Sequence, residues 1–535
     1  MVLACGSASG ARACARSARC SMRVWPQLPL ELTELIVSFM ERNEVATSFR
    51  LVNKAAAAQF CGPEHTTIRL SRPVPHHVFA AHWLSPGATR RLTLVQRQRL
   101  LFLTAASGAV YNMEAATEAA GCGLTYVLFH QTAEAGSLGS CQWLLQQGCP
   151  TSIVESWGSG LLAAAAGGGH QHVCEWLLSL DLVWRSLGDV EAARGGHVGL
   201  MEWLQQRRPQ LRIQDSLGNQ QPSGEQQMAD LVEAVAYGCD LAALRRHWRG
   251  WGRLTKAQQV VALEAAACSP TPDWAAKVEW LESQACSRGE EAVLRATLCP
   301  DAAARLAWLR GRGYNVRFVV ADTASGRSGL GSLAALQALH GACSAGDAAG
   351  PAAAAAAGLP SPRDLARCAA RGGALHVLVW LVEAFGAEAV ALDAELFALA
   401  CLRGNVELMG WMAGRGCAID AGAYRTAAES GCEEALEWLA ARGCPMPGDG
   451  GPYFAVCANG DRAAARCLQR LGCPWGPAGE LFERLVRERA PVTMMRWLLE
   501  AGCPADVGAA RAQVSGGGRW AAELLRLLEE RRAAA

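Results

Sequence analysis

The sequence predicts an all-α protein: a helical solenoid of about thirteen helix-turn-helix repeats, preceded by a small three-helix segment. Three observations support this prediction. A phrase that reads Trp-Leu-Leu-x-x-Gly-Cys-Pro in its fullest form recurs between residues 98 and 535. Ala-rich stretches broken by glycine precede its copies. Residues 28–40 carry apolar side chains at helical spacing, ahead of the first copy.

Residues 1–24 are expected to form a disordered basic tail. They carry Arg12, Arg16, Arg19 and Arg23, and no acidic residue precedes Glu31. If the segment were helical, the four arginines would share one face, as in a mitochondrial or chloroplast presequence. Organelle import is therefore kept as an alternative to residence in the cytoplasm or the nucleus.

Residues 25–62 are expected to form three short helices. Pro29 suits the first position of a helix, and Glu31 suits the positive end of its dipole. Asn43 is a candidate N-cap for a second helix over residues 44–52, and Asn53 is a candidate N-cap for a third.

This segment resembles an F-box, through Leu28-Pro29-x-Glu31-Leu32, the apolar residues near Ile36 and Phe39, and Arg50-Leu-Val-Asn-Lys54. In that family such residues bind the Skp adaptor of a cullin-RING ubiquitin ligase. The alternative is a helical cap that only seals the first repeat. The adaptor-binding residues implied by the resemblance are Leu28, Pro29, Leu32, Ile36, Phe39, Met40, Val45, Leu51 and Val52.

Residues 63–97 are interpreted as a connector. A short strand is expected at Thr66–Leu70, and Pro73, Pro75 and Pro86 interrupt the residues after this strand. Two insert loops are expected within the repeats, at about residues 209–228, which are rich in Gln, and at about residues 341–362, which contain a run of alanines.

The repeated phrase predicts a helix followed by its stop. Trp143 precedes Gly148 by five residues, and the same interval separates Trp438 from Gly443 and Trp497 from Gly502. A glycine after the last helical residue can adopt the left-handed conformation that satisfies the free carbonyls. We expect the Trp to be the buried knob of the second helix of each repeat and the Cys to be a small packing residue.

These repeats resemble ankyrin repeats. Gly169-His170, Gly196-His197, Gly404-Asn405 and Gly460-Asp461 correspond to the turn between the two helices of that family, and Trp-Leu-Leu corresponds to its Leu-Leu-Leu. The Thr-Pro-Leu-His signature is absent, and several repeats are short, so the projecting hairpins of the family are expected to be reduced. Tetratricopeptide or HEAT-type repeats are the alternative, and the ankyrin resemblance is preferred because those repeats need longer helices than the residues between these glycines provide.

Composition argues against several functional classes. The net charge is +1 with interspersed charges, so no polybasic surface indicates a nucleic-acid partner. The longest apolar runs are too short for a membrane span. Six of the 22 cysteines occupy the Gly-Cys position of the repeat, where neighbouring copies should lie too far apart for disulfides: Cys122, Cys149, Cys417, Cys444, Cys473 and Cys503. They are interpreted as buried thiols in a reducing compartment.

No catalytic motif is visible, and neither a cofactor nor a metal site is expected. None of the three lysines follows a glycine, which excludes a phosphate-binding P-loop. The pattern His170-x-His172-x-Cys174 is interpreted as part of a repeat turn rather than as a metal site. Ankyrin-like chains are sometimes grouped with lipid phosphodiesterases such as sphingomyelinases. That activity is kept as an alternative, although no arrangement of Asp, Glu and His supports it.

The sequence therefore predicts a protein-binding module rather than an enzyme. The favoured hypothesis is a substrate-recruiting subunit of a cullin-RING ligase, in which the F-box-like helices hold a Skp-type adaptor and the repeats hold a protein substrate. The alternative is a scaffold without a ligase connection. Aromatic residues outside the phrase are candidate partner-binding anchors: Trp157, Tyr424, Tyr453, Trp475 and Phe482.

Overall fold

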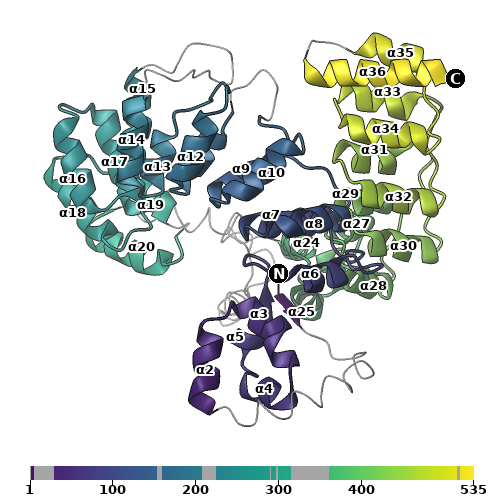
Figure 1. Ribbon diagram of the computed structural model, residues 1–535, viewed down its shortest axis with the longest axis horizontal. Helices are drawn as coiled ribbons and strands as arrows, with labels where there is room; N and C mark the ends of the chain where they lie inside the picture. Colours follow the sequence, from purple (N-terminus) through teal and green to yellow (C-terminus); the bar gives the residue numbers. More distant parts are fainter. Residues whose placement is uncertain are drawn as a thin grey trace. The chain divides into compact units, whose positions relative to one another are not determined.

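The computed structural model is built mostly of α-helices, as predicted (Figure 1). It describes residues 2–4, 29–152, 159–207, 224–289, 291–296, 299–314, 361–514 and 518–534. Two compact units are present, Met1–Thr151 and Ser152–Ala535.

The N-terminal unit begins with a short strand and continues through helices of modest length. Its described elements are β1 (Val2–Ala4), α2 (Leu30–Ser38), α3 (Arg42–Thr47), the 3₁₀ helix η2 (Phe49–Leu51), α4 (Lys54–Gln59), α5 (Pro63–Thr66), β2 (Thr67–Arg69), α6 (His76–Trp83), α7 (Leu94–Ala106), the 3₁₀ helix η3 (Val110–Asn112), α8 (Met113–Ala120), α9 (Tyr126–Glu134) and α10 (Leu138–Gln146).

Strands β1 and β2 pair antiparallel, with Val2 opposite Arg69 and Ala4 opposite Thr67. The strand expected near Thr66–Leu70 is therefore confirmed. The expectation of a disordered tail over residues 1–24 is wrong for residues 2–4, and the other residues of that tail lie outside the described part of the chain. The predicted connector contains the helix α6, which buries Phe79 and Trp83.

One of the two predicted helix caps is confirmed. Asn53 precedes α4, and its side-chain oxygen accepts a 2.8 Å hydrogen bond from the Ala56 amide. The prediction for Asn43 is wrong, because α3 begins at Arg42 and Asn43 lies within it. The Asn43 side chain is buried and instead bonds the backbone around β2. Pro29 is the residue before α2 rather than its first residue.

The second unit has two described series of helices. The first comprises α11 (Leu161–Gly167), α12 (Gln171–Leu178), α13 (Asp189–Arg194), α14 (Val198–Arg207), α15 (Gly224–Gly238), α16 (Leu241–Gly250), α17 (Lys256–Ala267), α18 (Trp274–Ser283), α19 (Glu291–Ala296) and α20 (Ala302–Gly311). The second comprises α24 (Pro362–Gly372), α25 (Leu375–Phe385), α26 (Ala387–Val390), α27 (Ala394–Leu402), α28 (Val406–Ala413), α29 (Gly422–Ser430), α30 (Glu433–Ala441), α31 (Gly451–Ala458), α32 (Arg462–Arg470), α33 (Glu480–Arg487), α34 (Val492–Glu500), α35 (Val507–Gln513) and α36 (Arg519–Ala534).

Both expected insert loops fall largely on residues outside the described part of the chain. The exceptions are residues 224–228, which belong to α15, and residues 361–362, of which Ser361 caps α24 and Pro362 begins it. These ends of the predicted loops are helical or cap a helix.

Alternate helices pack on one another within each series. Helix α11 contacts α13, which contacts α15, and the order continues through α17 to α19. In the second series α27, α29, α31, α33 and α35 follow one another in the same way, and α27, α29 and α31 each also pack against the next helix of the chain (Figure 1). A continuous apolar core runs through this series from Ala366 to Leu528.

The glycine of the repeated phrase ends its helix as predicted. Gly148, Gly443 and Gly502 have φ angles of 73°, 67° and 87°. The Cys444 amide donates to the Leu439 carbonyl at 3.2 Å, and the Gly443 amide donates to Ala440 at 3.0 Å, which is the Schellman pattern.

The cysteine after this glycine packs as expected. Cys149 and Cys417 are buried, and Cys444 is partly buried. The Cys149 thiol donates at 3.3 Å to the carbonyl of Thr125, the N-cap residue of α9, and the Cys417 thiol donates at 3.1 Å to the carbonyl of Asp393, the N-cap residue of α27. Burial raises the pKa of Cys149 to about 12, so this thiol stays protonated at neutral pH.

The tryptophan of the phrase is not the buried knob that we expected. Trp143, Trp411 and Trp438 are half-buried, whereas the residue after each of them is fully buried. The leucine or methionine in that next position therefore fills the core, and the indole covers the outer edge of the same helix.

Ala285 offers a test of the helix stop, because it occupies the glycine position after α18 with a φ of 60°. A side chain in this left-handed region costs about 1 kcal/mol. We expect Ala285→Gly to raise the free energy of unfolding by about 0.5–1 kcal/mol and Gly443→Ala to lower it by about 1 kcal/mol. A Cβ at Gly443 meets nothing within 4 Å, so only backbone strain is tested. Urea unfolding of both variants measures these changes in the free energy of unfolding. If both variants changed it in the same direction, backbone strain at the helix stop would not be the cause.

Candidate docking surface

The short helices before α6 expose large apolar side chains. Phe39 is 84% exposed and Leu51 is 70% exposed. The other exposed members are Leu32, Leu35, Ile36 and Val52. We call these six residues the apolar docking surface. Exposed apolar groups gathered in so short a stretch of chain are typical of interaction sites rather than of solvent-facing helices.

Helix α2 turns most of its apolar residues outward. Thr33 and Val37, one helical turn apart, form its buried side, and the Thr33 hydroxyl donates to the Pro29 carbonyl at 3.1 Å. Leu32, Ile36 and Phe39 lie on other faces and are exposed. An amphipathic helix normally buries its apolar stripe, so this arrangement leaves a large apolar area without an internal partner among the described residues.

A small core holds these helices together. Val37, Val45, Phe49, Ala56 and Phe60 are buried in it, and the rings of Phe49 and Phe60 meet edge to face at 5.7 Å between centroids. This cluster involves α2, α3, η2 and the end of α4, so the exposed residues project from a packed base.

The structure places the predicted adaptor-binding residues in three environments. Leu32, Ile36, Phe39, Leu51 and Val52 are exposed, as is Pro29. Met40 is partly buried against the small core. Val45 is 1% exposed, and the expectation that it contacts a partner is therefore wrong. Leu28 lies outside the described residues.

Leu35 belongs to the apolar docking surface but was absent from the predicted residues. It is 52% exposed on α2. The sequence did mark Leu35 as an apolar residue of this helix, since it lies beside Ile36 in the same apolar stripe. The stripe alone did not show which of its faces is buried.

The predicted aromatic anchors in the repeats are mostly core residues. Tyr424, Tyr453 and Phe482 are fully buried, so they cannot contact a partner in this fold. They occupy corresponding positions near the starts of α29, α31 and α33, where the side chain points into the space between helices. Trp475 is half-buried and stacks on Tyr453 at 4.0 Å between ring centroids. Trp157 lies outside the described residues.

The hydroxyls of Tyr424 and Tyr453 are buried and have no hydrogen-bond partner among the residues that the structure describes. A buried unsatisfied hydroxyl costs about 1–3 kcal/mol. The chain places phenylalanine at the corresponding positions Phe397 and Phe482. We therefore expect Tyr424→Phe and Tyr453→Phe each to raise the free energy of unfolding by about 1 kcal/mol, as measured by urea denaturation. Phe482→Tyr should lower it, and stabilisation by that variant would show that these sites tolerate a hydroxyl.

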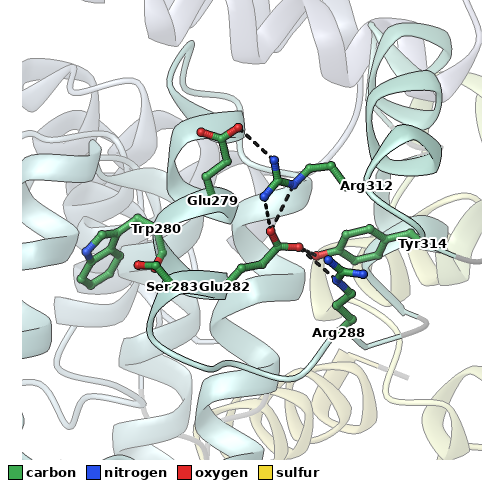
Figure 2. A network of polar contacts seen from close by, with 7 residues as sticks. All are labelled: Glu279, Trp280, Glu282, Ser283, Arg288, Arg312 and Tyr314. Atoms are coloured by element: carbon green, nitrogen blue, oxygen red, sulfur yellow. Dashed lines mark hydrogen bonds and ion pairs between the residues drawn. The ribbon is translucent and has the colours of Figure 1, made fainter.

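A polar network links α18 to the chain after α20 (Figure 2). The Glu282 carboxylate accepts hydrogen bonds from Tyr314 and Arg288, each at 3.1 Å, and from Nε of Arg312 at 3.0 Å. Arg312 also donates to Glu279 at 3.1 Å. Burial alone would raise the pKa of Glu282, but the hydrogen bonds and charges of these partners lower it. All the groups are committed to one another, so the network is structural.

The amine of Lys277 is fully buried between the ends of helices. It donates to the carbonyls of Ala236 at 2.7 Å and Cys239 at 2.9 Å, and to the Ser269 hydroxyl at 2.6 Å. Burial lowers its pKa to about 8, against the opposing charge of Asp273. Because its donors are directed at these acceptors, the amine closes the C-terminal end of α15 rather than serving as a nucleophile.

Potential ligand atoms of Glu433, Glu437 and Cys467 lie within 4.8 Å of one another. Arg470 occupies the same region, with Nη2 2.6 Å from Glu437 and 3.6 Å from Glu433. Burial raises the pKa of Cys467 to about 12, which disfavours the thiolate that a metal requires. These side chains are therefore interpreted as an ion pair between α30 and α32.

Neither the described helices nor the comparisons with known proteins place the chain in a family. Within the described residues, no helix has the length and apolar character needed to cross a bilayer. No known protein-family model matches the sequence, and no curated protein matches it.

Proposed function

We propose that the chain recruits a protein substrate to a cullin-RING ubiquitin ligase. In this proposal the helices before α6 act as an F-box that binds a Skp-type adaptor, and the later helices form an ankyrin-like solenoid of about thirteen repeats that holds the substrate. The observation that carries the proposal is the apolar docking surface, because it displays apolar side chains from α2 and from the chain around η2 above a separate small core.

The packing pattern supports a repeat architecture. Alternate helices follow one another in one layer, and α27, α29 and α31 pack with their successors in the chain. Such an array exposes long faces without a catalytic centre, which suits capture of a protein chain. A helical cap with no adaptor is the competing role for the N-terminal helices. A cap has no need of a phenylalanine as exposed as Phe39.

The experiment measures binding of a purified Skp-type adaptor to the full-length chain by biolayer interferometry. We expect Phe39→Asp and Val52→Asp each to weaken binding by at least about 30-fold, since a charge cannot be desolvated in an apolar interface without a partner. Phe39 follows α2 and Val52 follows η2. If the adaptor binds one surface formed by both elements, each variant should weaken binding.

Glu34→Gln provides the matched control, because Glu34 is exposed on α2 beside the apolar residues. This variant should bind as the unaltered chain does. Circular dichroism and thermal unfolding of all variants establish that the fold is retained. The proposal fails if the unaltered chain does not bind the adaptor, or if both aspartate variants bind normally.

A further inference from the structure

Four second helices of the repeats, or the turns after them, carry an arginine stacked on the phrase tryptophan four residues earlier. The distances from guanidinium carbon to indole centroid are 3.8 Å for Arg207 on Trp203, 5.0 Å for Arg312 on Trp308, 3.9 Å for Arg415 on Trp411 and 3.7 Å for Arg442 on Trp438. The half-buried indole is thus a platform that holds a guanidinium at the surface.

Two of these arginines are committed to internal partners. Arg312 is bound to Glu282 and Glu279 in the network of Figure 2. Arg207 donates to the Trp203 carbonyl at 3.4 Å. Both therefore use side-chain donors within the fold, and the charge of Arg312 is also paired there.

Arg415 and Arg442 differ from them. Both are exposed, and neither forms an ion pair or a side-chain hydrogen bond with any other described residue. The carbonyls at the ends of their helices already accept hydrogen bonds from amides of the turn. The Cys417 amide, for example, donates to the Met412 carbonyl at 3.2 Å. Each guanidinium keeps its donors available while stacking restricts its motion.

The two arginines occupy corresponding positions beside helices that touch. Helices α28 and α30 are in contact, and neighbouring packed helices lie roughly 8–10 Å apart. One extended peptide covers that separation with about three residues. The pair is therefore spaced to meet two acidic side chains of a single segment.

We propose that Arg415 and Arg442 bind an acidic segment of a partner protein through charge-assisted hydrogen bonds to its carboxylates. A guanidinium offers a carboxylate two parallel donors, and a stacked guanidinium loses less entropy on binding. A nucleic acid fits less well, because each indole has one face against its arginine and contacts the core, which leaves little aromatic surface for base stacking. This proposal rests on the proposed recruitment function and names its substrate class, yet it does not involve the adaptor.

The test uses the full-length chain and a labelled glutamate-rich peptide, followed by fluorescence anisotropy at low salt. The same peptide with glutamine in place of glutamate should not bind. We expect Arg415→Gln and Arg442→Gln each to weaken binding by about fivefold to tenfold, as for loss of one charge-assisted hydrogen-bonding group. Arg442→Lys, which keeps the charge but loses the planar fork, should weaken binding almost as much.

Arg466→Gln is the matched control, because Arg466 is an exposed arginine of α32 that makes no ion pair and covers no aromatic ring among the described residues. It removes the same charge and should leave the affinity unchanged. Equal weakening by Arg466→Gln, full binding by Arg442→Lys, or tighter binding of a single-stranded RNA than of the peptide would each overturn the proposal. Because no adaptor is present in the assay, its failure is distinguishable from failure of the ligase link.

Discussion

Replacing Asn43 by alanine is expected to lower the stability of the N-terminal unit by about 3–4 kcal/mol. The Asn43 amide nitrogen donates to the carbonyls of Arg69 at 2.8 Å, Arg72 at 3.2 Å and Pro73 at 2.9 Å. Its oxygen accepts from the Arg69 amide at 2.9 Å. One buried side chain thus ties α3 to β2 and to the turn after it, and truncation leaves several backbone groups without partners.

Hydrogen exchange is the suitable measurement, because it reports the two segments separately. In the Asn43→Ala variant, the backbone amides of residues 42–60 and 67–73 should lose protection together. The amides of α31 and α32 in the second unit should keep theirs. Loss of protection confined to α3 would show that Asn43 contributes only within its own helix.

Asn53→Ala provides the comparison of the same chemical change at a simple helix cap. In the unaltered chain the Asn53 side-chain oxygen accepts one hydrogen bond, from the Ala56 amide at 2.8 Å. Removing an N-cap of this type costs about 1 kcal/mol. The Asn43 variant should therefore be the more destabilised by about 2–3 kcal/mol, and equal effects would contradict the bridging role.

The contrast between these two asparagines shows which features were predictable. A cap depends on residues within four positions, so Asn53 and the glycine stops of the repeats could be predicted from the sequence. The partners of Asn43 lie 26–30 residues away. A local pattern carries no information about such a distant strand, and Asn43 is equally compatible with a cap.

The same reason explains the errors about burial. Periodicity identifies an apolar stripe on α2 but does not say which elements will cover it, so the exposure of Phe39 and the burial of Val45 depend on tertiary packing. Tyr424 and Tyr453 lie close to turns, a position typical of exposed residues. Close packing of α29 and α31 encloses them instead.

Shortening Leu439 to alanine is expected to cost about 3 kcal/mol of unfolding free energy, which is the usual range for a fully buried leucine. Leu439 is 0% exposed and lies in the continuous core of the second series. Its neighbours come from adjacent helices, which cannot all move into the cavity without breaking their own contacts. Urea unfolding with an unchanged m-value would measure the loss directly.

Trp438→Leu tests the other side of the same helix. The indole is half-buried and covered on its outer face by Arg442, so replacing it by another apolar side chain removes a modest buried area and should cost about 1 kcal/mol. If Trp438→Leu lowered the free energy of unfolding by more than Leu439→Ala does, the tryptophan would be the main packing residue of the repeat. We expect the smaller loss for Trp438→Leu, which leaves the indole mainly the role of holding Arg442. The variant should therefore stay folded and bind the glutamate-rich peptide more weakly, because Arg442 is no longer held by stacking.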